Sequence, residues 1–354
     1  MSSCDFCKVA SKAPLKSCVC KKASYCSQEC QIKDWKTHKP SCPPFTIRES
    51  PGKGRGLFAT RRINEGQIIL EEYPLFTLNY SLQEFRTKYY PNIDEETKAN
   101  IFKLNDPVDI FKIRDTDSVE DSFFKNQLKK DCTEEMTKIL RIFTGNRINI
   151  CADPSLYSNH NEAGLYNNIS LINHSCLPNA VDSWVMGDFK RHQVRALSTI
   201  QKNEEIVLSH HQYCQKFQRG SREFRRQKLL EDRGFLCECS ECSLEGEDLQ
   251  ENEMMRAEIR EKSEELLSGR TVGSDARRTV KKAMKVAQRI ANLVQILNIR
   301  LMFVTEMICF YDAASDAKRI GISAPDPDKF KQEALKYAKK YGDAFSYYCN
   351  KCFQ

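Results

Sequence analysis

The stretch that decides the fold is Asn173-His174-Ser175-Cys176-Leu177-Pro178-Asn179. An apolar run, Ser170-Leu171-Ile172, precedes it, and Asn203-Glu204-Glu205-Ile206-Val207-Leu208 follows downstream with the pattern of a turn and a buried strand. The simplest interpretation of the seven residues is a polar loop stiffened by Pro178. A functional interpretation is favoured by the rest of the chain, because cysteine pairs and a glycine-rich turn accompany this segment.

Length and composition bound the possible classes of protein. The chain has 354 residues, of which 40% are hydrophobic and 29% charged, so we expect more than one globular domain. Its net charge of +7 is spread among interleaved acidic and basic residues, so no segment predicts a nucleic-acid-binding arm. No apolar run predicts a signal peptide or a membrane span, which needs roughly 18 apolar residues.

The cysteines predict zinc rather than disulfide bonds. There are 17 of them, and several stand in Cys-x-x-Cys spacing without a preceding secretion signal. Such usage is typical of the reducing cytoplasm and nucleus, and we expect a cytoplasmic and nuclear protein.

The first 42 residues contain eight candidate zinc ligands, enough for two closed tetrahedral sites. A segment of this length with few aliphatic side chains cannot fold by apolar burial alone, so metal binding must supply most of its stability. The candidate ligands are Cys4, Cys7, Cys18, Cys20, Cys26, Cys30, His38 and Cys42.

This segment resembles a MYND zinc finger over its whole length, through Tyr25-Cys26-Ser27 and the spacing Trp35-x2-His38-x3-Cys42. The resemblance implies that alternate pairs share a metal: Cys4, Cys7, Cys26 and Cys30 hold one zinc, and Cys18, Cys20, His38 and Cys42 the other. One residue separates Cys18 from Cys20, where the family usually has two. The family's role is protein binding, often to proline-rich partners; a purely structural appendage is the alternative.

After a Pro43-Pro44 linker, the chain contains Gly52-Lys53-Gly54-Arg55-Gly56-Leu57-Phe58-Ala59. Glycines in such a turn let the backbone approach a ligand closely. Together with Asn173-His174, the turn resembles the opening of a SET domain, the fold of S-adenosylmethionine (AdoMet)-dependent lysine methyltransferases. The cofactor-binding residues that the resemblance implies are Lys53, Gly54, Arg55, Asn146, Asn173, His174 and Phe235. For Lys53 and Arg55 a solvated surface turn is the alternative, and for Asn146 an ordinary strand-edge position.

A third zinc site is predicted near the end of the SET domain. Ser221 to Arg233 has the pattern of a helix that begins at an N-cap serine and ends at Gly234. Three cysteines follow closely, and one further ligand is needed to complete a tetrahedral site. The fourth is expected to be Cys176, as in the post-SET zinc of the family. The predicted set is Cys176, Cys237, Cys239 and Cys242.

Nearly the full length of the chain resembles the SET and MYND domain-containing (SMYD) family. The resemblance implies an α+β protein: a MYND finger over 1–43, a SET-domain β fold with a pseudoknot over 44–212 with a helical insert near 80–142, a post-SET segment over 213–245, and an all-α tetratricopeptide-like domain over 246–354. The finger precedes the glycine-rich turn, an order that resembles a divergent invertebrate branch. A monomer with three zinc ions is expected.

The family's activity is methyl transfer from AdoMet to a lysine of histone or non-histone proteins. Where relatives have a channel tyrosine this chain has His210, and a second tyrosine position holds Arg233. His210, Tyr213 and Tyr166 are the candidate catalytic residues; with an ordinary pKa near 6.5, a neutral His210 is expected to accept a proton from a lysine ammonium. The alternative is a catalytically weak or inactive adaptor that binds partners through its finger.

Overall fold

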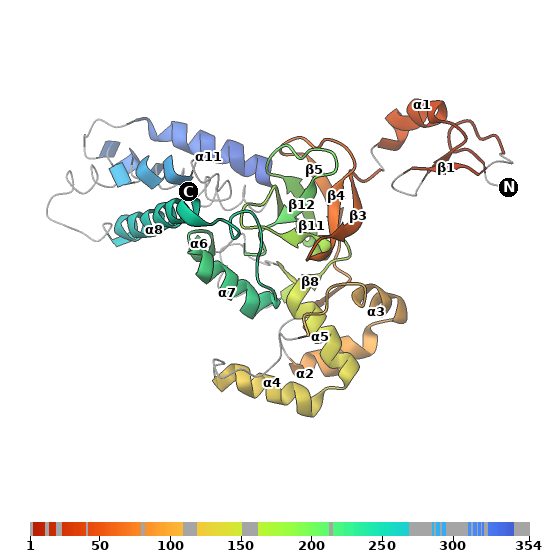
Figure 1. Ribbon diagram of the computed structural model, residues 1–354, viewed down its shortest axis with the longest axis horizontal. Helices are drawn as coiled ribbons and strands as arrows, with labels where there is room; N and C mark the ends of the chain where they lie inside the picture. The colour runs from red at the N-terminus through yellow and green to blue at the C-terminus, as the bar shows by residue number, and fades with distance from the viewer. Residues whose placement is uncertain are drawn as a thin grey trace.

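The computed structural model contains a small finger, a β-rich body with a helical insert, and a helical C-terminal region (Figure 1). This arrangement confirms the predicted α+β class. Within the described part of the chain, no helix combines the length and apolarity that crossing a membrane requires. The described residues are 3–10, 14–18, 23–39, 42–78, 82–108, 119–150, 162–211, 215–268, 325–342 and short stretches between 285 and 321.

The finger consists of strands β1 (Lys16–Ser17) and β2 (Ser24–Tyr25) and helix α1 (Gln28–His38). It projects from one end of the body, on the right of Figure 1. Arg61 of the body joins the two, because its Nη2 donates to the Cys42 carbonyl at 3.0 Å while its guanidinium lies 5.3 Å from the Trp35 ring centroid. The finger is therefore held at its C-terminal end by one side chain of the body.

Three small sheets form the body, in strand orders β3-β4-β12-β9, β10-β11-β5 and β6-β8-β7. Two-residue strand β9 pairs in parallel with β12, so that Val207 faces Asn173 and Leu208 faces His174. Burial of Ile206 and Leu208 in the core fixes the face that β12 presents. The strands are β3 (Phe45–Ser50), β4 (Gly54–Ala59), β5 (Ile68–Glu72), β6 (Phe76–Leu78), β7 (Ile148–Ile150), β8 (Glu162–Leu165), β9 (Asn173–His174), β10 (Ala180–Val185), β11 (Asp188–Ala196) and β12 (Glu205–Leu208).

The predicted helical insert is present and packs around its own apolar core, with Phe85, Ile101 and Phe143 buried. Its last helix continues to Asn146, so Asn146 ends a helix and does not take the strand-edge position considered for it. That strand, β7, begins only at Ile148. The helices are α2 (Leu82–Glu84), a π-helical turn (Phe85–Tyr89), a 3₁₀ turn (Tyr90–Asn92), α3 (Glu95–Ile101), α4 (Val119–Asp131) and α5 (Glu134–Asn146); a further 3₁₀ turn (Ile169–Leu171) precedes β9.

The predicted post-SET helix is confirmed as α7 (Arg222–Arg233). The Ser221 hydroxyl accepts a hydrogen bond from the Phe224 backbone N–H, and Gly234 ends the helix at φ 78°. This left-handed conformation suits glycine, which has no Cβ to clash. Short helix α6 (Gln215–Gln218) precedes it.

The C-terminal helices pack against both the signature loop and the body. In α8 (Gly246–Ser268), Ile259 forms a cluster with Val286, Ile290, Leu293 and Val294, and Leu177 packs against that cluster. Helix α11 (Pro327–Tyr341) lies beside β11, and Lys340 forms a 3.3 Å ion pair with Glu65. Much of the tetratricopeptide-like domain predicted over 246–354, including residues 269–284 and 295–310, lies outside the described residues.

Glu72 anchors the turn that leads into the signature loop. Its carboxylate accepts hydrogen bonds from the backbone N–H groups of Asn168 at 2.9 Å and Ile169 at 2.6 Å, and from the Asn168 side-chain amide at 2.9 Å.

We expect Glu72→Ala to lower the free energy of unfolding by about 1.5–3 kcal/mol, the usual worth of hydrogen bonds to a charged group. Urea unfolding measures this. The neighbouring Glu71→Ala is the control, because among the described residues the Glu71 carboxylate makes a single exposed ion pair, with Arg191 at 3.7 Å, worth about 0–1 kcal/mol. Equal losses in both variants would contradict the anchoring role.

Candidate active site and zinc centres

Three clusters of metal-ligating side chains are present among the described residues. In each cluster the ligand atoms all lie within 4.8 Å of one another. Tetrahedral coordination with Zn–S bonds of about 2.3 Å places neighbouring sulfurs about 3.8 Å apart. The observed sulfur separations of 3.5 to 3.7 Å agree with that geometry. The clusters are Cys4, Cys7, Cys26 and Cys30; Cys18, His38 and Cys42; and Cys176, Cys237, Cys239 and Cys242.

The two finger clusters follow the alternating pairing expected of a MYND finger. The first is complete with four cysteines, and the second has three ligands. Its predicted fourth ligand, Cys20, lies outside the described residues. Thiolate and imidazole ligands in closed sets of this kind suit Zn²⁺ in a structural role.

The third cluster joins the signature loop to the post-SET segment. All four of its cysteines are buried, and the Sγ atoms of Cys176 and Cys242 lie 3.6 Å apart. The Cys176 backbone N–H also donates to Cys239 Sγ at 3.4 Å. A metal here holds the post-SET segment directly against strand β9. The chain therefore has three zinc-binding sites.

The signature asparagine lies where three segments distant in sequence meet. Asn173 Nδ2 donates to the Arg55 carbonyl at 3.2 Å and to Glu205 Oε1 at 2.8 Å. A Cβ added to Gly56 would come within 2.8 Å of that amide and 2.5 Å of the Glu205 carboxylate. Gly56 is therefore required for close packing of β4 on β9 and β12.

The glycine-rich turn provides open space beside this asparagine. Gly54 has a φ of 72°, and a Cβ built on it would meet no atom within 4 Å. Lys53 lies at the same turn, with its Nζ 3.5 Å from Glu205 Oε2. A polar corner of amide, ammonium and carboxylate, open to solvent, suits the charged amino-acid end of a ligand such as AdoMet.

Asn146 does not share this corner. Both hydrogens of its amide are used, because Nδ2 donates to the carbonyls of Asn105 and Ile142 at 2.7 Å each. Its backbone carbonyl accepts from the Ser170 hydroxyl at 3.0 Å. The side chain thus ties the end of α5, and this arrangement does not support the cofactor contact expected from the resemblance.

Aromatic rings surround His174 on the other side of β9. Its ring centroid lies 5.3 Å from that of His210, 5.9 Å from Phe217 and 6.0 Å from Phe235. Phe235 is partly exposed and is 6.0 Å from His210 as well. An aromatic wall with one partly exposed ring suits a flat ring such as adenine, so the residues present fit AdoMet at both of its ends.

The hydrogen bonds of the two histidines assign their protons. The His210 backbone N–H donates to His174 Nδ1 at 3.1 Å, so the neutral His174 carries its proton on Nε2, 3.5 Å from Cys176 Sγ. His210 Nε2 donates to the Ile172 carbonyl at 3.2 Å. His210 Nδ1 is buried and accepts no hydrogen bond from the described residues.

The protonation of His210 differs from the expectation. Burial, together with the nearby Arg233 guanidinium, lowers the pKa of His210 to about 3 instead of the ordinary value near 6.5. Burial also lowers the pKa of His211 to about 3 and that of His174 well below its usual range. With such a pKa His210 cannot accept a proton from a lysine ammonium; it can only accept a hydrogen bond.

The guanidinium of Arg233 is held by hydrogen bonds to backbone carbonyl groups. Its Nη1 donates to the carbonyls of Gly145 at 3.2 Å and Arg147 at 2.9 Å, and Nη2 lies 3.5 Å from the His210 carbonyl. The guanidinium thus joins the ends of α5, α7 and β12, and its charge acts on the imidazoles.

Tyr166 does not take the place of the tyrosine hydroxyl that the resemblance implies near His210. Tyr166 is fully buried in the core; its hydroxyl donates to the Lys190 carbonyl at 2.9 Å and its ring contacts His192. This position does not support a catalytic role for Tyr166. Tyr213 lies outside the described residues.

Two residues of the site, Glu205 and Phe217, could not be recognised from the sequence. Glu205 holds both Asn173 and Lys53, and Phe217 completes the ring cluster around His174. The Glu204-Glu205 pair was visible as a turn, but only pairing of β12 with β9 reveals which carboxylate faces the asparagine.

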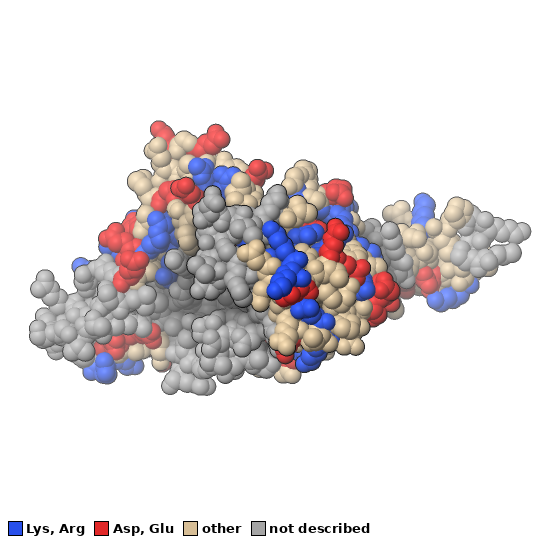
Figure 2. All heavy atoms as spheres, turned by 90° about the horizontal axis from the view of Figure 1, so that it is seen from below, with Lys and Arg blue, Asp and Glu red and all other residues tan. Residues whose placement is uncertain are grey.

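One face of the surface and one cavity lie apart from the corner at Asn173. On the face in Figure 2, basic and acidic side chains lie side by side over the described residues. A cavity of about 740 Å³ lies elsewhere, between the Pro43-Pro44 linker, Arg61 and β5, and its lining does not include Asn173, His174 or Phe235.

Comparison with known families and proteins agrees with this geometry. The SET domain family matches residues 54–211, and the MYND finger family matches residues 4–42. The chain is similar to the histone-lysine N-methyltransferase ASHR1 of Arabidopsis thaliana, with 28% identity over 267 residues, covering 72% of this chain and 49% of that protein.

Two human proteins are also similar. N-lysine methyltransferase SMYD2 of Homo sapiens is 26% identical over 246 residues, covering 69% of this chain and 51% of that protein. Histone-lysine N-methyltransferase SMYD3 of Homo sapiens is 26% identical over 260 residues, covering 69% and 52%. The chain thus spans about half the length of the curated relatives it matches.

Elemental analysis of the purified protein is expected to find three zinc ions per chain. Cys176→Ser should lose about one zinc and lower the thermal midpoint, because it opens a four-ligand site. Cys132→Ser is the control, since Cys132 is a free cysteine that belongs to none of the three clusters. One zinc or none in the wild-type protein, without chelator treatment, would contradict the assignment.

Stability should depend on pH through His210. The unfolded imidazole titrates near 6.5, whereas the folded one has a pKa of about 3, so the unfolded state binds the proton first. His210 therefore stabilises the fold above pH 6.5, and this contribution is lost as the pH falls toward 3. Between pH 7.5 and 5.5, His210→Phe should lose about 1 kcal/mol less stability than the wild type. Urea unfolding with zinc content checked at each pH measures this; parallel curves would contradict the shifted pKa.

Proposed function

Because the chain belongs to the SMYD family of SET and MYND domain proteins, we propose that it is an AdoMet-dependent protein-lysine N-methyltransferase acting on histone or non-histone proteins. The observation that carries this proposal is the meeting of β4, β9 and β12 at Asn173, beside an open glycine turn. Bound AdoMet supplies the methyl group; all remaining tasks belong to the residues of the chain.

The polar corner at Asn173 binds the amino-acid end of the cofactor. Lys53 attracts the carboxylate, and Glu205 together with Asn173 suits an ammonium group. Phe235 and the imidazole of His174 provide the apolar wall for the adenine. A zinc ion bound by Cys176, Cys237, Cys239 and Cys242 would have four protein ligands and no open position, so its role would be structural, keeping His174 and Phe235 in place.

His210 orients the substrate lysine. Its Nε2–H is committed to the Ile172 carbonyl, which leaves Nδ1 as a hydrogen-bond acceptor without a partner among the described residues. A lysine amine can donate one N–H to His210 Nδ1. The lone pair of the amine nitrogen then points away from His210 and is free to attack an electrophile. The resemblance implies a tyrosine hydroxyl at this position, which can both donate and accept a hydrogen bond. The Nδ1 atom of His210 can only accept one, so we expect turnover to be weak.

A second function, partner binding through the finger, rests on a separate observation. The finger exposes large apolar side chains, with Phe6 at 40%, Val9 at 62% and Ile32 at 65%. Exposed apolar groups of this size on so small a module are typical of protein-binding surfaces, and proline-rich segments are the partners we propose. In the adaptor alternative this is the whole function, performed by a monomer of the cytoplasm and nucleus.

Cofactor binding is tested by calorimetry with AdoMet. Asn173→Ala should weaken binding by about 1–3 kcal/mol, because a polar group of the cofactor loses its hydrogen-bond partner. Asn179→Ala is a matched control in the same loop, where the side chain bonds Glu204, Glu205 and Val207 instead. Unchanged affinity in a folded Asn173→Ala protein would reject the cofactor assignment.

Methyl transfer is tested on a protein library with wild type, His210→Tyr and His211→Tyr. We expect a low wild-type rate that rises in His210→Tyr, where an orienting hydroxyl is restored, and does not rise in His211→Tyr. A wild type as active as His210→Tyr would contradict the impaired-site interpretation. Cofactor binding without turnover in all three proteins would favour the adaptor.

A further inference from the structure

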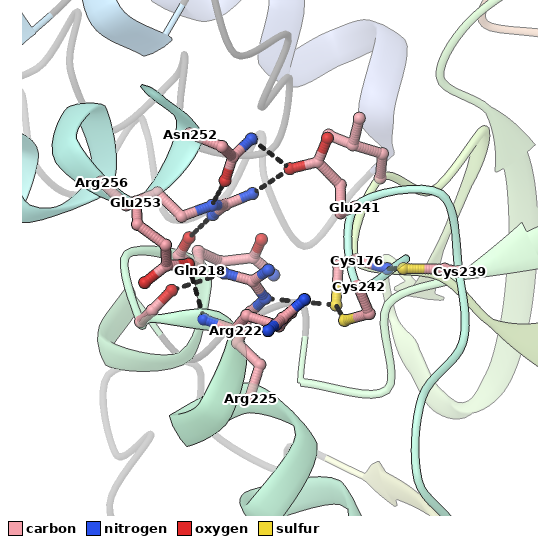
Figure 3. Close-up of polar contacts among 12 residues, drawn as sticks. Cys176, Gln218, Arg222, Arg225, Cys239, Glu241, Cys242, Asn252, Glu253 and Arg256 are labelled. Atoms are coloured by element: carbon pink, nitrogen blue, oxygen red, sulfur yellow. Dashed lines mark hydrogen bonds and ion pairs between the residues drawn. The ribbon is translucent and has the colours of Figure 1, made fainter. Parts of the chain in front are cut away.

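A buried arginine lies against the post-SET zinc cluster. Arg225 of α7 is 1% exposed, and its Nε donates to Cys176 Sγ at 3.3 Å. Its Nη1 donates to the Gly220 carbonyl, and Nη2 is buried without a hydrogen-bond partner among the described residues. Figure 3 shows the guanidinium directed at the Cys176 and Cys242 sulfurs.

The charge of Arg225 has no carboxylate to balance it within the described part of the chain. A guanidinium stays protonated in proteins, and burying an unpaired charge is strongly unfavourable. Neutral thiols would not offset that cost. A Zn²⁺ ion with four thiolates carries a net charge of −2, which supplies the missing counter-charge. Burial of the Arg225 charge is thus explained if the four cysteines bind zinc as thiolates.

A neighbouring arginine shows the ordinary solution to the same problem. Arg256 of α8 is equally buried, but its Nη2 lies 2.7 Å from Glu241 Oε2, and its other donors bond Asn252 and the Gln218 carbonyl. Glu241 stands between Cys239 and Cys242 in the zinc-binding segment. Arg256 therefore joins α8 to that segment as a neutral pair, and none of its hydrogen bonds to the described residues goes to a sulfur (Figure 3).

We propose that Arg225 is a positioning residue whose guanidinium is the buried counter-ion of the post-SET zinc tetrathiolate. It acts through Cys176, which also lies 3.5 Å from the protonated Nε2 of His174. Two donors, one from α7 and one from β9, thus converge on the same sulfur. Arg225 thereby neutralises part of the negative charge on this sulfur. It also strengthens zinc retention and fixes the loop that contains Asn173 and His174.

The experiment measures zinc rather than methyl transfer, so it is independent of the proposed enzymatic function. Full-length, zinc-loaded protein is treated with a chelating dye, and the rate of zinc release is recorded. Differential alkylation then locates the released site at the peptide with Cys237, Cys239 and Cys242. The variants are Arg225→Gln, which keeps a donor but not the charge, Arg225→Lys, which keeps the charge, and Arg256→Met as the control of equal burial.

We expect Arg225→Gln to release the post-SET zinc 10–100-fold faster than the wild type. This is the usual size of the effect when a hydrogen-bond partner of a metal ligand is removed. Arg225→Lys should stay close to the wild type. Arg256→Met should lower the thermal midpoint without faster zinc release from the folded protein. In cobalt-substituted protein, the sulfur-to-metal absorption should shift in Arg225→Gln alone.

Three results would overturn the proposal. Equal release from Arg225→Gln and Arg225→Lys would show that the charge is unimportant. Equal release and equal spectra in Arg225→Gln and Arg256→Met would show a merely structural role. If Arg225→Gln does not fold, Arg225→Lys remains decisive, because a lysine variant that folds but releases the post-SET zinc 10–100-fold faster than the zinc-loaded wild type would remove the counter-ion interpretation.

Discussion

The bond between Cys176 and its metal is the constraint on which the rest of the site depends. Cys176 is two residues from His174, so the ion that binds it also fixes the strand that pairs with β12. The same ion holds Cys237, two residues after Phe235, and therefore brings that ring to the imidazoles. Leu177 meanwhile packs into the cluster of the C-terminal helices. One short loop thus couples the metal, the cofactor corner and the helical region.

Much of this architecture was predictable because the signals are local or chemically distinctive. Cysteine spacing identifies metal ligands directly, since few other functions need several thiols within six residues. The start and end of α7 were visible in Ser221 and Gly234, because capping and left-handed geometry restrict the residue type at those two positions. Counting ligands showed that the triad Cys237, Cys239 and Cys242 lacks one member of a tetrahedral set, and the resemblance to the family implied that Cys176 supplies it.

What escaped prediction depends on contacts between distant segments. Asn146 was assigned to a strand, but the helix before it continues through that residue, and helix boundaries are poorly fixed by pattern alone. Arg225 and Arg256 are basic residues in charged helices and would ordinarily be solvent-exposed; only their packing on the zinc segment buries them. The low pKa of His210 likewise arises from burial and from Arg233, which approaches from α7.

The electrostatics around His210 also decide what the two departures from the family mean for catalysis. Methyl transfer needs a neutral amine, whereas a free lysine is protonated at neutral pH. The burial and the Arg233 charge that keep His210 neutral disfavour any cation beside it, so in the proposed reaction they would also lower the pKa of a substrate lysine amine. Arg233 is compatible with the chemistry for this reason, although it would disfavour the binding of a charged lysine. In the proposed reaction the remaining loss is one of orientation, since the His210 imidazole would accept only a single hydrogen bond from the amine.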